Sequence, residues 1–321
     1  RRVVLAEGED ARVLRAAQIA IDEGLAVPLL IGRPSVIEAR IAKAKLRMKL
    51  GTDVTCVNPD DDPRFRQYWQ AYHQLMGRRG VGPEAAKAAV HRSNTIIAAL
   101  MVRLGDADGM LCGMHGRFDA HLENIENIIG LQPGATTLAT LSALSMDKRT
   151  LFIADTYVNE TPTSEQLARI ALKSVEQVRT FGLPPKVAFL SHSNYGSSRR
   201  DSARRVREAY EIFRSMAPDV ECDGEMHGDA AMLEAIRRDN LMESSLHGEA
   251  NILVCPNIDA ANILFNVLKA VTSGATTMGP MLMGAAAPAH VMTPSSTVRR
   301  ILAMMALVAA QAGQKAGVAR L

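Results

Sequence analysis

Short runs of β-branched and other apolar residues alternate with amphipathic helical stretches along the whole chain, and this alternation constrains the fold most strongly. It is typical of an α/β protein with mostly parallel sheets covered by helices. The expected strands are residues 3–6, 27–31, 109–113, 151–154, 186–190, 250–255, 281–283 and 290–292. The expected helices lie in residues 10–23, 63–79, 83–104, 163–181, 206–213, 260–271 and 298–309.

The length of 321 residues favours two α/β lobes over a single domain. We place the crossings near Pro133-Gly134 and near Pro288, because no repeat or low-complexity linker separates the lobes. The first lobe is then residues 1–134 plus 291–321, and the second lobe is residues 135–290.

Composition excludes several classes of protein. Apolar residues make up 47% and charged residues 22%, with a net charge of +3, so neither disorder nor a broad nucleic-acid-binding surface is expected. The four cysteines lack the paired spacing of a zinc site or a redox dithiol, and no metal site is expected. The sequence contains no membrane span or signal peptide, which predicts a cytoplasmic protein without a membrane partner. Because the chain begins without methionine, we expect a piece of a longer polypeptide.

Polar residues gather directly after the expected strands, where ligands bind in open parallel sheets. The segments are 7–10, 113–117, 191–198, 223–225 and 293–296. Segment 191–198 is rich in hydroxyl groups, contains a glycine and precedes a helix, so it could hold a phosphate. Simple capping of the following helix explains the same residues, and both interpretations stay open.

Three acidic residues, Asp223, Glu225 and Asp229, could form a divalent-metal cluster, since alternation along a strand would put the first two on one face. We favour another interpretation, in which Asp229 caps a helix and the other two accept hydrogen bonds from loops.

Arg299 and Arg300 occupy the expected first turn of the last helix, where the helix dipole favours acidic side chains. A phosphate near this turn, reached also by Ser295, Ser296 and Thr297, would compensate the two charges. Alternatively, both arginines point into solvent or pair with acids elsewhere.

The same segments resemble the phosphate acetyl/butyryltransferase family over essentially the whole chain. The resemblance is carried, in order, by residues 5–10, 105–110, 190–197, 223–225, 250–253 and 279–284. Residues 117–122, 155–160 and 192–194 are more similar to the branch of this family that is fused behind an NADP-dependent malic enzyme module.

The resemblance implies an isocitrate/isopropylmalate-dehydrogenase-like fold, a cleft between the lobes that accepts CoA, and dimers formed through the second lobe. It also implies a catalytic stretch Asp-Leu-Ser-Arg-Gly, followed by a helix whose aspartate is the base toward the CoA thiol. Here Thr293 replaces the serine, Pro294 replaces the phosphate-binding arginine, and Arg300 falls on the aspartate. An anion-binding arginine of the family falls near Glu123. Because arginine stays protonated, acyl transfer should be lost and no catalytic residue is assigned.

The resemblance therefore predicts a regulatory and oligomerising domain with acetyl-CoA as allosteric effector. It implies no cofactor in this domain, and NADP and a divalent metal only in an N-terminal malic module. The expected partners are this module, a CoA ester and further copies of the chain. The predicted ligand-binding residues are Arg117, Ser191, His192, Ser193, Asn194, Tyr195, Ser197, Thr293, Ser295, Ser296, Arg299 and Arg300.

Three other functions stay open. The first is a working phosphate acetyltransferase, acting on acetyl phosphate and CoA. The second is a metal-dependent decarboxylating dehydrogenase that uses the acidic cluster. The third is a purely structural assembly domain.

Overall fold

The computed structural model describes residues 1–241, 243–272 and 274–318, and the chain divides into two compact units. Unit 1 comprises Arg1–Gly134 and Ala285–Leu321, and unit 2 comprises Ala135–Gly284. The return crossing lies earlier than the predicted residue 290, because Ala285 forms a β-bridge with Leu131, which belongs to unit 1.

Unit 1 contains a five-stranded sheet in the order β11-β4-β1-β2-β3, and every strand pair in it is parallel. The strands are β1 (Arg2–Leu5), β2 (Val27–Ile31), β3 (Thr55–Val57), β4 (Gly109–Cys112) and β11 (Ala289–Val291). The short strand β3 was not predicted, because three residues give too little alternation to recognise. The other four strands were predicted to within one or two residues.

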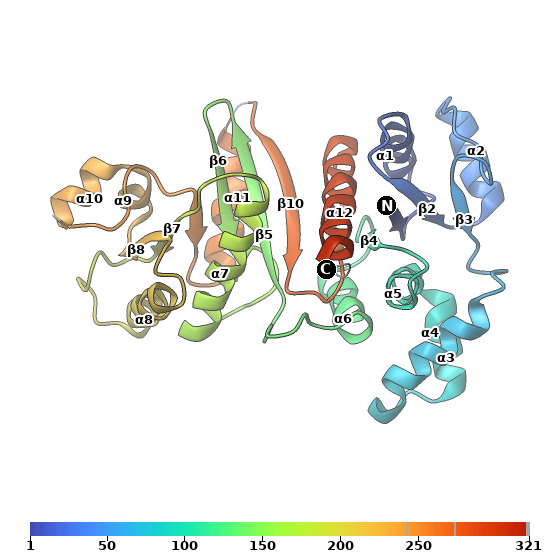
Figure 1. The fold of residues 1–321 in the computed structure, drawn as a ribbon, viewed down its shortest axis with the longest axis horizontal. Helices are drawn as coiled ribbons and strands as arrows, with labels where there is room; N and C mark the ends of the chain where they lie inside the picture. Colours follow the sequence, from blue (N-terminus) through green and yellow to red (C-terminus); the bar gives the residue numbers. More distant parts are fainter. Residues whose placement is uncertain (242, 273, 319–321) are drawn as a thin grey trace. The chain divides into compact units, whose positions relative to one another are not determined.

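The helices of unit 1 lie on both sides of this sheet. They are α1 (Ala11–Asp22), α2 (Pro34–Lys43), α3 (Phe65–Met76), the 3₁₀ turn η1 (Gly77–Arg79), α4 (Pro83–Arg92), α5 (Asn94–Leu104), α6 (Phe118–Ile128) and α12 (Val298–Val318). In Figure 1, α1, α2 and α12 lie on one side of the strands and α3, α5 and α6 on the other. This arrangement leaves the carboxyl ends of the parallel strands as an open edge.

The predicted helix 83–104 is in fact two helices, so this prediction is wrong. Ser93 has extended backbone angles and separates α4 from α5. Its hydroxyl accepts a hydrogen bond from the Ile96 N–H at 3.3 Å and caps α5. Serine competes in this way with the continuing helix, which periodicity alone does not reveal.

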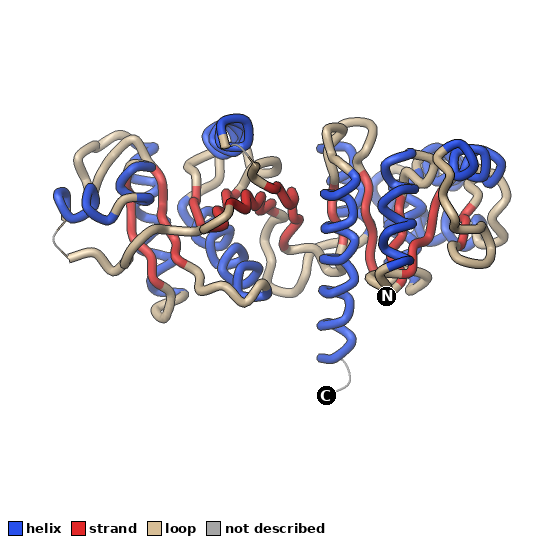
Figure 2. The backbone as a smooth tube through the Cα atoms, turned by 90° about the horizontal axis from the view of Figure 1, so that it is seen from above, coloured by secondary structure: helices blue, strands red, loops and turns tan. Residues whose placement is uncertain are grey.

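Helix α12 packs against α1 and against β1, β4 and β11, and Figure 2 shows it as a long helix beside the strands. His290 on β11 is 1% exposed, and its Nε2 lies 3.0 Å from Gln311 Oε1 on α12. Burial lowers the pKa of His290 to about 4, so the ring is neutral at physiological pH. It is a structural side chain of the core.

Unit 2 contains a six-stranded mixed sheet in the order β10-β5-β6-β9-β7-β8. Strands β10, β5 and β6 pair antiparallel, and β6, β9, β7 and β8 pair parallel. The strands are β5 (Ala139–Met146), β6 (Arg149–Ala154), β7 (Lys186–Leu190), β8 (Glu221–Met226), β9 (Ile252–Val254) and β10 (Thr276–Met283). The helices are α7 (Ser164–Thr180), α8 (Asp201–Met216), α9 (Gly228–Met232), α10 (Glu234–Asn240) and α11 (Ile258–Val271).

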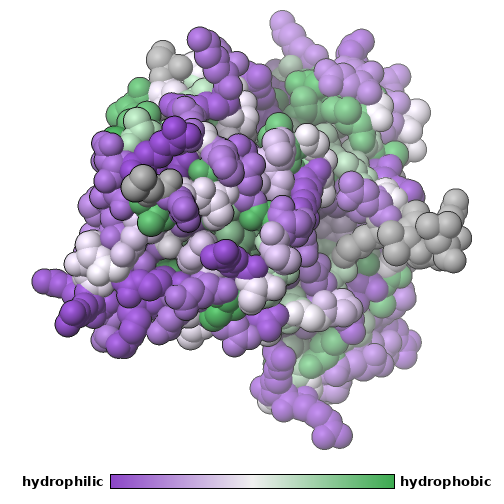
Figure 3. Space-filling model, turned by 60° about the vertical axis from the view of Figure 1, so that its left-hand side comes forward, coloured by the Kyte–Doolittle hydropathy of each residue, from purple (hydrophilic) through white to green (hydrophobic). Residues whose placement is uncertain are grey.

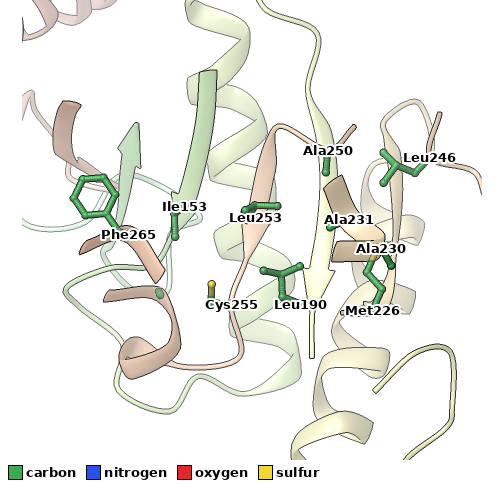
Figure 4. Packing of buried hydrophobic residues seen from close by; sticks show 12 residues of the cluster. Ile153, Leu190, Met226, Ala230, Ala231, Leu246, Ala250, Leu253, Cys255 and Phe265 are labelled. Carbon is green, nitrogen blue, oxygen red and sulfur yellow. The ribbon is translucent and has the colours of Figure 1, made fainter. Parts of the chain in front are cut away.

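The core of unit 2 joins the parallel strands to α11. Figure 4 shows Ile153, Leu190, Leu253 and Phe265 from β6, β7, β9 and α11 in this cluster of buried side chains. The predicted capping box at the start of α7 is confirmed, because Thr163 and Gln166 each bond the other's backbone N–H. The packing of the core cluster fixes the strands whose carboxyl ends lead into the polar loops.

The surface face in Figure 3 is largely hydrophilic, with hydrophobic side chains in small groups. Among the helices in the described residues, none combines the length and the apolar character that crossing a bilayer requires.

Candidate functional site

In unit 1, three polar loops follow adjacent parallel strands. The loops after β1, β4 and β11 leave the same edge of the sheet because these strands are neighbours in the order β11-β4-β1. The Glu7 carboxylate accepts a hydrogen bond from the Gly113 N–H at 2.9 Å, which joins the first two loops. The Met292 N–H donates to the Cys112 carbonyl, which joins the second and third. Such an edge, where strand order reverses, is where open α/β sheets bind ligands.

The third loop forms a compact turn before α12. The Ser296 side chain is buried, and its Oγ accepts the Thr293 N–H at 3.2 Å. The Thr293 hydroxyl lies 3.2 Å from the Ser295 hydroxyl, and the Thr297 hydroxyl accepts the Arg300 N–H at 3.3 Å. The predicted residues Thr293, Ser295 and Ser296 therefore lie together, with Ser295 exposed and Ser296 inside.

An ion pair that was not predicted from the sequence holds this turn. Arg12 donates to the carbonyl oxygens of Pro294 at 2.6 Å and Ser296 at 3.1 Å. Its guanidinium also pairs with Asp10, the N-cap of α1, at 2.8 Å. In the sequence, Asp10 and Arg12 stand out only as a charged pair at a predicted helix start. The carbonyl of Pro294, which Arg12 contacts, lies 282 residues further along the chain.

The two arginines of the last helix differ in exposure. Both lie in the first turn of α12, as predicted, and Arg299 is exposed, whereas Arg300 is only 9% exposed. A guanidinium therefore lies inside unit 1 at the position where the resemblance requires the catalytic carboxylate. Arg117, the remaining predicted residue of this unit, is exposed and pairs with Asp119 at the start of α6.

A pocket of about 480 Å³ opens at the same edge of unit 1. Its lining includes Glu7, Asp10, Asn94 and His115, and His115 Nε2 lies 3.1 Å from Asp10 Oδ2. Burial raises the pKa of the Glu7 carboxyl to about 7, against hydrogen bonds from backbone N–H groups that lower it. Glu7 can therefore take up or release a proton near neutral pH. The sequence showed Glu7 as part of a polar segment, but its burial is a property of the fold.

In unit 2, the loop Ser191–Ser198 follows β7 and folds around a carboxylate of its own chain. The Glu225 side chain is fully buried, and Oε1 accepts hydrogen bonds from the Ser193 hydroxyl at 2.7 Å and the Gly196 N–H at 2.9 Å. Arg207 donates to both carboxylate oxygens, at 2.7 and 2.9 Å. Burial acts to raise the pKa of Glu225, but Arg207 and Ser193 hold it below its usual value.

The remaining predicted residues of this loop are arranged around that centre. Ser191 Oγ accepts the Ser193 N–H at 3.2 Å, and Ser197 Oγ accepts the Asn194 N–H at 3.0 Å. The exposed His192 ring lies 3.1 Å from Ser198 Oγ.

Two contacts tie this loop to its surroundings. Asn194 Oδ1 accepts the His227 N–H at 2.7 Å. Tyr195, at φ +47°, packs its ring against the core of unit 2. The two groups of predicted residues thus lie in different units, and the expected cleft between the lobes stays a prediction.

The acidic cluster considered for a metal is divided among separate partners. Glu225 faces the loop, Asp223 accepts hydrogen bonds from Ser244 and its neighbour Gly224, and Asp229 accepts from Ala230. A shift of register between β7 and β8 also interrupts the strand alternation on which the metal hypothesis depended. Across the described residues, no three His, Cys, Asp or Glu side chains are grouped as metal ligands.

Comparison with known proteins identifies the family. The Phosphate acetyl/butaryl transferase family matches residues 1–309, and the chain belongs to it. NADP-dependent malic enzymes of Salmonella typhimurium and Escherichia coli are 51% and 50% identical over 97% of this chain. A phosphate acetyltransferase of Nitratidesulfovibrio vulgaris is 32% identical over 98%. The chain spans only 41–44% of the length of these relatives. The resemblance to the family and to its malic enzyme branch is confirmed.

Solved structures correct the expected fold. A phosphotransacetylase from Streptococcus pyogenes matches with a TM-score of 0.89 at 28% identity, covering 98% of this chain and 94% of that one. The EutD phosphotransacetylase from Staphylococcus aureus matches with a TM-score of 0.85 at 25% identity, covering 97% and 94%. The expected isocitrate/isopropylmalate-dehydrogenase-like fold is wrong, and the fold is that of the phosphotransacetylases. Alternating strands and helices are common to many α/β folds and specify neither strand order nor crossings.

We expect replacement of Glu7 by Gln to change the pH dependence of stability. Because burial raises the pKa of Glu7 from its usual 4.5 to about 7 in the folded state, ionising Glu7 disfavours the folded state as pH rises through this window. The free energy of unfolding of Glu7→Gln, relative to that of wild type, should therefore increase by up to about 3 kcal/mol as the pH rises from 4.5 to 7.5. Urea unfolding followed by circular dichroism at several pH values measures this difference.

Glu9→Gln is the matched control, since Arg33 lowers the pKa of Glu9 and the effect has the opposite sign. Glu9→Gln should be less stable than wild type at neutral pH, and this difference in stability should shrink as the pH falls. A stability difference between wild type and Glu7→Gln that is constant over the whole window would contradict the assignment to Glu7.

Proposed function

We propose that this chain is the regulatory and oligomerising module of a cytoplasmic NADP-dependent malic enzyme. In this proposal a separate N-terminal module carries out the oxidative decarboxylation of malate to pyruvate with NADP and a divalent metal. The phosphotransacetylase-like module binds acetyl-CoA as an allosteric effector and no longer transfers acyl groups. The observation that carries the proposal is the buried Arg300, where acyl transfer to CoA requires a carboxylate.

Loss of acyl transfer follows from the chemistry of the turn before α12. The Arg300 guanidinium stays protonated and cannot take a proton from the CoA thiol. Pro294 offers no charge to a phosphate, and its carbonyl is already bonded to Arg12. A missing base and a missing anion clamp each commonly cost 10²-fold or more in rate.

Acetyl-CoA binding is supported by the polar groups that stay accessible on both loops. Ser295 and Arg299 are exposed at the start of α12, and His192 and Ser197 are exposed on the loop after β7. Regulation then requires that acetyl-CoA favours one of two states of the malic module, so that the coupling is a free energy shared by the two sites. Similarity over 97% of this chain to malic enzymes supports the attached module as partner.

Self-association is supported by an apolar stripe on α11 of unit 2. Ile263, Val267 and Val271 recur every four residues and are 62%, 52% and 72% exposed. Side chains four residues apart lie on one face of a helix. A second copy packing on this stripe would remove it from water, so we assign it to a dimer contact.

A working phosphate acetyltransferase is the second candidate function. It is favoured by Glu7, a carboxyl with a pKa of about 7 in the pocket of unit 1, which is suited to accept a proton near neutral pH. In this alternative Glu7 takes over the role of the missing aspartate.

Two measurements on the isolated chain separate these functions. Calorimetry should give saturable acetyl-CoA binding, and a thiol assay with acetyl phosphate and CoA should give turnover at least about 10²-fold below a working phosphotransacetylase. Absence of acetyl-CoA binding contradicts the sensing role. Robust turnover that Glu7→Gln abolishes would establish the second candidate.

If the stripe on α11 forms the dimer contact, combining Ile263→Glu with Val267→Glu should dissociate the dimer into monomers. Two buried charges per subunit without partners cost more than the apolar contact contributes. Size-exclusion chromatography with light scattering should show the mass falling to that of the monomer, 34.7 kDa. Leu233→Glu, at a 52% exposed site outside α11, is the control and should leave the mass unchanged. A dimer that survives the double variant rules out this stripe.

A further inference from the structure

The loop Ser191–Ser198 has the sequence of a phosphate cradle, but its interior already contains an anion. Glu225 Oε1 accepts from the Ser193 hydroxyl and the Gly196 N–H, and Arg207 neutralises the carboxylate. We propose that Glu225 is a built-in anion that excludes phosphate from this loop and leaves its neutral polar rim as the contact surface for a ligand. Glu225 is thus a positioning residue that also sets the chemical specificity of the loop.

The backbone of β8 aims Glu225 at the loop. Along the β7–β8 pair, Phe189 lies opposite Gly224 and Leu190 opposite Met226, so the register of the pair shifts at Glu225. Such an irregularity re-aims a side chain that regular pairing would hold in the ladder. Gly224 is required here, because a Cβ at this position would lie 2.7 Å from Phe189 Cβ.

The inner donors of the loop are bonded to the Glu225 carboxylate, to the backbone of β8 or to other groups of the loop. The Tyr195 N–H donates to the Glu225 carbonyl at 2.9 Å, and the Ser198 N–H donates to Ser193 Oγ at 3.0 Å. Gly196, at φ +90°, turns its N–H inward, and residues with a side chain rarely adopt this backbone conformation. The Glu225 carboxylate is thus held by the Gly196 N–H, the Ser193 hydroxyl and the Arg207 guanidinium, as a bound anion would be, except that it is covalently part of the chain.

Charge inside the loop opposes a second anion. In the interior, the Glu225 carboxylate and the Arg207 guanidinium sum to zero, so no net positive charge is left there to attract phosphate. The next cations, Arg199 and Arg200, follow the loop at the surface. A phosphate in the interior would lie against a fully buried carboxylate and would have to displace it from Arg207. The rim offers hydroxyl, amide and imidazole groups at Ser197, Asn194 and His192, which suit amide or carbonyl groups of a ligand.

This inference depends on the proposed function only for the nature of the ligand, a CoA ester whose amides and thioester carbonyl are neutral. Inorganic phosphate is therefore the probe, and the test does not require acetyl-CoA to bind. Failure of acetyl-CoA binding in calorimetry and failure of phosphate exclusion are seen in different experiments.

The experiment titrates wild type and Glu225→Ala with inorganic phosphate and with formate, which replaces the missing carboxylate. Glu225→Ala should be destabilised, and its thermal midpoint should rise with either anion, because the vacated place retains Gly196, Ser193 and Arg207. Wild type should show no such rise. Glu221→Ala is the matched control on the same strand, since its carboxylate pairs with Lys186 at the surface, and it should behave like wild type.

A second measurement tests the proposal if Glu225→Ala does not fold. In ¹⁵N-labelled wild type, phosphate should leave the amide resonances of Gly196 and Ser198 unchanged. Saturable shifts of these two resonances would overturn the proposal. So would a folded Glu225→Ala that responds to phosphate and formate no more than Glu221→Ala does.

Discussion

Carboxylates of the chain itself hold the loops at the carboxyl ends of the strands. Glu7 accepts the Gly113 N–H in unit 1, Glu225 accepts the Gly196 N–H in unit 2, and the buried Asp155, directly after β6, accepts the Asn159 N–H of its own loop. Backbone groups in such loops cannot pair within a sheet, and leaving them buried without a partner is costly. Each carboxylate removes that cost and fixes the loop before any ligand arrives.

The surroundings of these carboxylates decide what each can do. Glu225 is paired with Arg207, which holds its pKa below the usual value, so it is an anion at neutral pH. Glu7 accepts hydrogen bonds from backbone N–H groups instead, and burial raises its pKa to about 7, so its charge varies near neutral pH. A glutamate therefore has a fixed charge in unit 2 and a charge that depends on pH in unit 1.

Local patterns in the sequence predicted most elements, because apolar periodicity and capping residues act over a few positions. The box of Thr163 and Gln166 is such a case, whereas the break at Ser93 was missed because one residue interrupts an otherwise continuous pattern. The assigned fold, which was taken from the family resemblance, was wrong. The alternation of strands and helices could not correct it, because alternation does not specify how the strands are connected.

The candidate loops were found because polar residues cluster after strands, but their interiors were not predictable. The burial of Ser193 depends on Glu225, 32 residues further on, and the hold on Ser296 depends on Arg12 near the opposite end of the chain. Contacts of this range leave no local trace in one sequence. Comparison with the family pattern, at Arg300 and at Thr293 and Pro294 before it, indicated from sequence that the chemistry had changed.

The division of the chain between the units bears on its synthesis. Unit 2 is one continuous stretch, so it can acquire all its contacts once residue 284 has left the ribosome. Unit 1 must wait, because β11, which completes its sheet beside β4, and α12, which covers it, follow unit 2 in the chain. Until then its first four strands expose apolar surface, and this half of the protein is the one that needs protection by chaperones during translation.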